Sequence, residues 1–120
     1  MSLNHPIIRS FPYAINGLKT ALKNEPNFRV HISFALVVII LGLILKLTAV
    51  EMAILFLTIG FVIIMELINT MLESLVNLVS PEIREHAKIA KDVSAAAVLV
   101  SAIISIVIGI LLFLPKLVLL

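Results

Sequence analysis

Three long apolar stretches decide what this chain can fold into. They run over about residues 30–50, 52–72 and 93–114, and each approaches the roughly 20 residues that a helix needs to cross a bilayer. With 62% of its 120 residues hydrophobic and 13% charged, the chain is too apolar for an ordinary soluble domain. The sequence therefore predicts an all-α integral-membrane protein, with residues 1–120 forming a single domain.

The segment before the first span predicts a helix of another kind. Over residues 7–23, apolar side chains fall on one side of a helix and polar or basic ones on the other. Such an amphipathic helix suits the headgroup region of a membrane surface. The triplet Asn24-Glu25-Pro26 then marks a break, with Asn24 as the cap of the first span.

The basic residues predict the orientation of the spans. Seven of the nine Lys and Arg residues precede the first span or lie between the second and third, and the positive-inside rule makes that side cytoplasmic. We therefore expect the N-terminus inside and the C-terminus outside. In the inner loop, Ser80-Pro81-Glu82 predicts the start of a short polar helix over residues 81–91.

A polar stripe interrupts the second span. Glu66, Asn69 and Glu73 lie at helical spacing, within roughly 60° of one another on one face. Because an ionisable side chain in a membrane segment costs about 3 kcal/mol or more, Glu66 is a functional candidate. The alternative is that Glu66 only makes a hydrogen bond between helices.

Depth in the membrane separates the roles of these carboxylates. With Glu51 at the outer interface, a rise of about 1.5 Å per residue puts Glu66 about 22 Å along the helix. That is roughly 7 Å short of the inner edge of a 30 Å hydrocarbon core, where Glu66 could act as general base on a lipid hydroxyl. Glu73 lies past that edge, level with Glu25. Two carboxylates from different helices suit Mg²⁺ whose other ligands are water and phosphate.

Further polar groups lie at the same level of the predicted membrane. Lys91 and Asp92 begin the third span there, so Lys91 offers a cation for phosphate. No Walker A pattern or kinase glycine loop occurs in the sequence. His31 and His86 have no ligand partner at helical spacing, and we expect structural roles for both.

The third span carries a small residue at every fourth position: Ala97, Ser101, Ser105 and Gly109. Such ladders let helix backbones approach closely in lipid, where no hydrophobic force drives association. Three helices can cover few polar groups alone, so the ladder predicts a homo-oligomer.

The block ELINTMLESLVNLVSPEIREHAKIAKDVSAAAVL resembles the signature of the small prokaryotic diacylglycerol kinase and undecaprenol kinase family. That pattern is roughly E-x-x-N-[ST]-A-[IL]-E, a variable turn, then A-K-D and a run of small residues. The N-terminal stretch YAINGLKTALKNEPNFRVH is similar to the family's surface helix and N-E motif. The resemblance covers essentially the whole chain.

The resemblance implies an ATP-dependent lipid kinase, homotrimeric, with active sites shared between subunits at the cytoplasmic face of a prokaryotic inner membrane. Glu66 would be the base for the lipid hydroxyl, with Asn69 beside it in the substrate site. Glu25 and Glu73 would hold the Mg²⁺ of MgATP. The expected partners are a lipid alcohol, MgATP and further copies of the chain, without nucleic acid. The residues that would contact the nucleotide are Tyr13, Glu25, Glu73, Glu82, Lys91 and Asp92.

Three positions depart from the family pattern or vary within it. Met71 replaces the usual Ala after N-[ST], and Asn77 stands where the family has an acid. Diacylglycerol-using members tend to have Gly-Ser where Ser94-Ala95 stand, while polyprenol-using members tend to have small apolar residues. Ala95 therefore favours a polyprenol such as undecaprenol over diacylglycerol at the substrate site.

A proton or cation pathway and a purely structural oligomer are the two alternatives to a kinase. Membrane carboxylates also serve proton or cation pathways, but the outer half of the second span offers Thr58 as its one polar residue before Glu66. A purely structural oligomer would not need Glu25, Glu73 and Lys91 gathered at one level. Both observations favour the enzyme.

Overall fold

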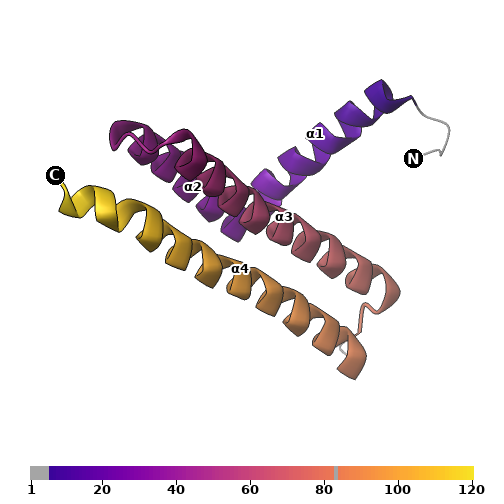
Figure 1. Cartoon of the computed structure of the whole chain (residues 1–120). Coiled ribbons are helices and arrows are strands. Elements are labelled where there is room, and N and C mark those ends of the chain that lie inside the picture. The colour runs from indigo at the N-terminus through magenta and orange to yellow at the C-terminus, as the bar shows by residue number, and fades with distance from the viewer. Residues whose placement is uncertain (1–5, 83) are drawn as a thin grey trace.

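The computed structural model describes residues 6–82 and 84–120, and this part of the chain contains four helices and no strand. It consists of α1 (Ile7–Asn24), α2 (Pro26–Ile44), α3 (Ala49–Val79) and α4 (Glu85–Val118). The last three are each long and apolar enough to cross a membrane. They run alongside one another, and α1 leaves them at a steep angle (Figure 1). The prediction of an all-α protein with three apolar spans is confirmed.

The junction between α1 and α2 places Glu25 beside the C-terminal half of α3. Because α2 has 19 residues and α3 has 31, α2 begins partway along α3 rather than at its end (Figure 1). Glu25 is extended and Pro26 takes the first position of α2, where its missing N–H is not needed. Glu25, not Asn24, therefore occupies the N-cap position, and the prediction of an Asn24 cap is wrong.

Arg29 fixes the angle of this junction. Its Nη1 donates hydrogen bonds to the carbonyl oxygens of Leu22, at 2.8 Å, and Lys23, at 2.9 Å. These belong to the last turn of α1, whose carbonyls have no partner within the helix. A cation there also complements the negative end of the helix dipole.

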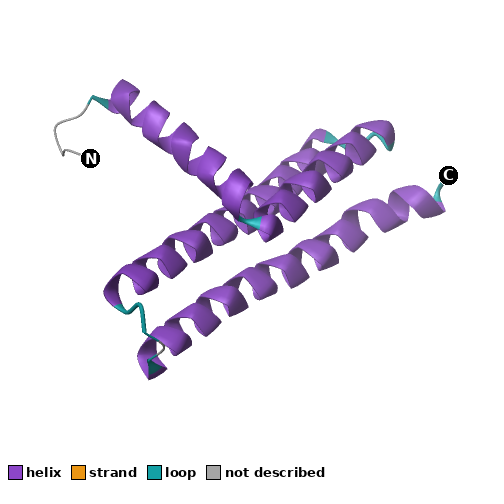
Figure 2. Ribbon diagram, turned by 180° about the vertical axis from the view of Figure 1, so that it is seen from behind, coloured by secondary structure: helices purple, strands orange, loops and turns teal. Residues whose placement is uncertain are grey.

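A tight turn over residues 45–48 joins α2 to α3, so the helices end and begin earlier than the predicted spans. Thr48 caps α3: its Oγ1 accepts from the Glu51 N–H at 3.2 Å and donates to Glu51 Oε1 at 3.1 Å. Lys116, near the end of α4, lies 3.2 Å from the same carboxylate. The turn and the C-terminus accordingly lie at the same end of the molecule (Figure 2).

The opposite end has a longer connection. α3 continues to Val79 and α4 starts only at Glu85, while Ser80 Oγ donates to the Glu82 carbonyl at 3.0 Å instead of capping a helix. The predicted helix over residues 81–91 is therefore wrong in its start. From Glu85 onward it is continuous with the third span.

Packing is closest between α3 and α4, and small residues make it possible. Ser101 is completely buried, and its hydroxyl donates to the Val98 carbonyl of its own helix at 2.7 Å. The ladder predicted to join subunits thus has Ser101 buried within one chain. At the turn end, Leu55, Leu112 and Phe113 form the apolar core, while most other large apolar side chains are exposed.

Candidate functional site

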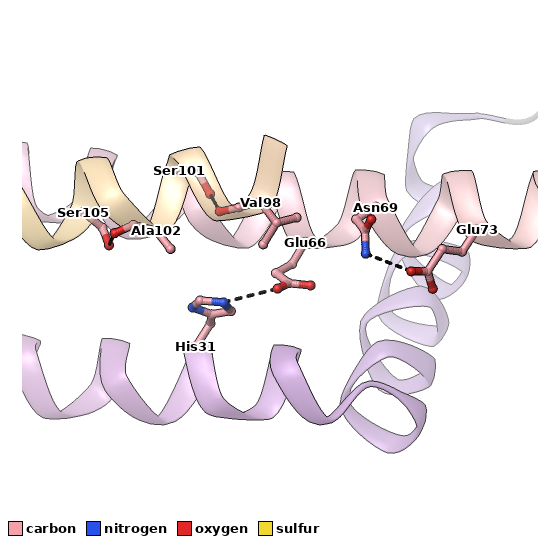
Figure 3. Close-up of polar contacts among 8 residues, drawn as sticks. All are labelled: His31, Glu66, Asn69, Glu73, Val98, Ser101, Ala102 and Ser105. Atoms are coloured by element: carbon pink, nitrogen blue, oxygen red, sulfur yellow. Dashed lines mark hydrogen bonds and ion pairs between the residues drawn. The ribbon is translucent and has the colours of Figure 1, made fainter. Parts of the chain in front are cut away.

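Glu66 lies on α3 where that helix passes the start of α2. The residue is 2% exposed, and its Oε1 lies 3.2 Å from Nε2 of His31 on α2 (Figure 3). His31, which has no partner at helical spacing within its own helix, thus meets one on a neighbouring helix. Periodicity within one helix could not reveal this contact, because it joins two helices. Folding the sequence about the turn at residues 45–48 would have placed His31 near Glu66.

The polar stripe continues toward the end of α3. Asn69 Nδ2 donates to Glu73 Oε1 at 3.3 Å, one turn further on (Figure 3). Asn69 Oδ1 and Thr70 Oγ1 are buried without a hydrogen-bond partner among the described residues. Buried polar atoms are usually paired, so these two oxygens are exceptions. The predicted alignment of Glu66, Asn69 and Glu73 is present in the helix.

Glu25 and Glu73 surround Glu66 with negative charge. Both carboxylates lie close enough to Glu66 for electrostatic repulsion, and both residues are half-buried. No group of three or more acidic or histidine side chains that could hold a metal occurs in residues 6–82 and 84–120. Two carboxylates alone would leave most of the coordination of a divalent cation to water or phosphate.

A second group of predicted residues meets where α3 leads into α4. A pocket of about 290 Å³ is lined by Glu82, Lys91 and Asp92 among others. Lys91 Nζ donates to Asn77 Oδ1 at 2.6 Å, so the residue that departs from the family pattern contacts a residue expected to bind nucleotide. Because the Asn77 amide is neutral, it holds Lys91 without cancelling its charge. Lys88 forms an ion pair with Asp92.

Two predicted residues lie away from this pocket. Tyr13 is exposed on α1 and Ala95 is exposed on α4, next to the buried Ser94. Neither lines the pocket at the α3–α4 connection. Within a single chain, then, the structure gathers Glu82, Lys91 and Asp92 in one place, and Glu25, Glu66 and Glu73 in another.

A cavity of about 350 Å³ lies between α2, α3 and α4 and is lined by His31 at one point. His31, Thr58 and Ser105 are its polar side chains, and the rest of the lining is apolar or glycine. Its chemistry suits hydrocarbon rather than a charged ligand.

Three long apolar helices, each able to cross a membrane, and a buried carboxylate on the second of them are the features of a multi-pass membrane protein. Residues 12–113 match the profile of the prokaryotic diacylglycerol kinase family. The chain belongs to this family and is an ATP-dependent membrane lipid kinase. The enzyme prediction is confirmed, and phosphoryl transfer from ATP implies a metal ion.

Named relatives divide between two acceptors. The chain is 42% identical over 109 residues to the undecaprenol kinase of Bacillus subtilis, covering 91% of this chain and 89% of that protein. It is 44% identical over 112 residues to a diacylglycerol kinase of Synechocystis sp., covering 92% of this chain but 64% of the longer relative. The diacylglycerol kinase of Escherichia coli K12 is 30% identical over 101 residues, with 84% and 83% covered.

Proposed function

We propose that Glu66 is the general base of this lipid kinase and that its acceptor is the hydroxyl of undecaprenol. The supporting observation is the burial of an ionisable carboxylate, 2% exposed, in an apolar span. It lies about 22 Å along α3 from Glu51. A lipid hydroxyl can reach this depth while its chain stays in the bilayer.

In the proposed reaction, Glu66 accepts the proton of the lipid hydroxyl while the lipid oxygen forms a bond to the γ-phosphorus of ATP. The bond from that phosphorus to the β–γ bridging oxygen breaks, and ADP leaves with the bridging oxygen. The buried Asn69 Oδ1 is placed to accept a hydrogen bond nearby. Mg²⁺, held by Glu25 and Glu73 together with the phosphates, would neutralise phosphate charge. Lys91, held by Asn77, would add a cation.

The Glu66→Gln variant tests the assignment of the base. Glutamine keeps the shape and can contact His31 but cannot accept the proton, so phosphoryl transfer should fall by about 10²–10⁴-fold. The measurement is turnover of purified enzyme with labelled ATP and undecaprenol, with Glu85→Gln, on an exposed residue, as control. Near-normal turnover by Glu66→Gln in an intact fold would refute this role for Glu66.

The choice of acceptor rests on Ala95 and on the name of the B. subtilis relative. A methyl group at position 95 offers no hydrogen bond to the glycerol part of diacylglycerol, and a site that bonds a polar substrate group discriminates more strongly than one that lacks the bond. We expect a modest preference for undecaprenol, with a shift toward diacylglycerol in Ala95→Ser. Competition between the two lipids in one assay checks this. A strong wild-type preference for diacylglycerol would contradict it.

We also propose a homotrimer with sites completed by neighbouring chains, an N-terminus in the cytoplasm and α1 lying in the inner headgroup region. The exposed apolar surface of the spans supports contacts beyond the single chain. The excess of basic residues on one side supports the orientation. The apolar residues of α1, among them Phe11 and Ile15, are exposed and available to lipid.

A further inference from the structure

We propose that His31 is a positioning residue of this kinase, which holds the Glu66 carboxylate so that one oxygen faces the lipid hydroxyl. The inference rests on the proposed role of Glu66 as the base. It concerns a residue to which the sequence motif assigns no part.

The contact joins two helices at their most enclosed polar point. His31 Nε2 lies 3.2 Å from Glu66 Oε1, and the two side chains are 24% and 3% exposed. At this distance the imidazole N–H can donate a hydrogen bond to the carboxylate. The second carboxylate oxygen points away from His31, toward the side where Asn69 and Glu73 lie (Figure 3).

The charges around Glu66 explain why it needs this partner. Glu25, at the α1–α2 junction, and Glu73, on α3, both repel the Glu66 carboxylate, and His31 is the group that attracts it. The imidazole N–H can satisfy one carboxylate oxygen and leave the other oxygen free. The carboxylate can thus be held in place and still accept a proton.

Holding the base affects the chemical step more than binding. A carboxylate with a fixed orientation keeps its free oxygen within reach of the hydroxyl. Small displacements of such a catalytic group lower the reaction rate strongly. Because a hydrogen bond to a charged group contributes more than one between neutral groups, removing it should lower kcat by about 10- to 100-fold. The KM values for MgATP and lipid should change little.

Three substitutions at one position separate the donor from the bulk of the side chain. His31→Leu and His31→Met fill the space without a donor, and the flexible Met side chain serves if the Leu variant folds poorly. His31→Gln keeps an N–H at a similar reach. The control is Ser33→Ala on the same helix, since Ser33 is exposed and its hydroxyl bonds only to the Arg29 carbonyl. Each variant is assayed for kcat and KM with undecaprenol in bilayers, after thermal unfolding has shown that it is folded.

We expect His31→Leu and His31→Met to lose about 10- to 100-fold in kcat, with His31→Gln and Ser33→Ala within about threefold of wild type. A folded donorless variant with wild-type kcat would overturn the inference, as would an equal loss in His31→Gln.

A double-mutant cycle tests whether His31 acts through Glu66. In a Glu66→Gln background, His31→Met should cause little further loss, because the base it holds is already absent. A loss of the same size in both backgrounds would mean that His31 acts independently, and would overturn the proposal. If Glu66→Gln itself retained normal turnover, the assignment of the base would fail. A slow Glu66→Gln with a wild-type kcat in the donorless His31 variants would refute only the role of His31.

Discussion

The polar side chains of α3 differ in the helix that each of them contacts. Glu66 contacts α2 through His31, Glu73 contacts its own helix through Asn69, and Asn77 contacts α4 through Lys91. The three polar groups therefore contact three different helices, although all of them lie along α3. A change at one should alter a distinct step of the reaction.

The metal dependence of the reaction should follow from Glu25 and Glu73. Replacing either with Gln removes one anionic oxygen ligand, so the Mg²⁺ concentration for half-maximal rate should rise about tenfold or more. Mn²⁺, which binds such ligands more tightly, should restore part of the rate. Rates measured against free metal at saturating lipid check this, with Glu85→Gln as control. An unchanged metal profile in both variants would exclude a shared site.

The sequence predicted the site residues on one helix better than the contacts between helices. Glu66, Asn69 and Glu73 follow from a period of 3.6 residues, which needs no tertiary information. The pairing of His31 with Glu66 and of Lys91 with Asn77 depends on how neighbouring helices are aligned. That alignment is decided by two turns whose positions hydropathy does not reveal.

At the scale of elements, the contact between α3 and α4 depends on Ser101. A Leu at this fully buried position must push the two helices apart, and such overpacking should destabilise the fold by about 1–3 kcal/mol. Ser101→Ala should be nearly neutral, because the hydroxyl bonds only to its own helix. Thermal unfolding in detergent measures both, with Ile106→Leu, at an exposed position, as control. A Ser101→Leu variant as stable as wild type would show that the helices can separate without cost.

The helices themselves were predictable because each apolar run is long enough for a span. Their ends were not. Leu45, Leu47 and Val50 continue the apolar pattern across the first turn, so hydropathy does not reveal the capping pair Thr48 and Glu51. At the second connection, Ser80-Pro81 has the composition of a helix start, but α4 begins only at Glu85.

For the whole molecule, the question is whether each active site belongs to one chain. Lys91 and Glu66 lie in separate groups within the protomer. We expect mixed oligomers of Glu66→Gln and Lys91→Ala, each inactive alone, to regain activity, because one interface would combine an intact Glu66 with an intact Lys91 from its neighbour. Activity after co-reconstitution checks this, with each variant alone as control. Mixtures that exchange subunits yet stay inactive would place each site within a single chain.

The length of α3 has an energetic consequence for the substrate. Its 31 residues extend for about 46 Å, so the helix exceeds a hydrocarbon core of about 30 Å by several turns. Lifting a long-chain alcohol into water would cost about 0.8 kcal/mol for every methylene exposed. A helix that extends from the hydrocarbon core into water makes that extraction unnecessary. If Glu66 is the base, as proposed, the lipid hydroxyl stays near its own depth, and ATP, the small and soluble reactant, travels to the membrane.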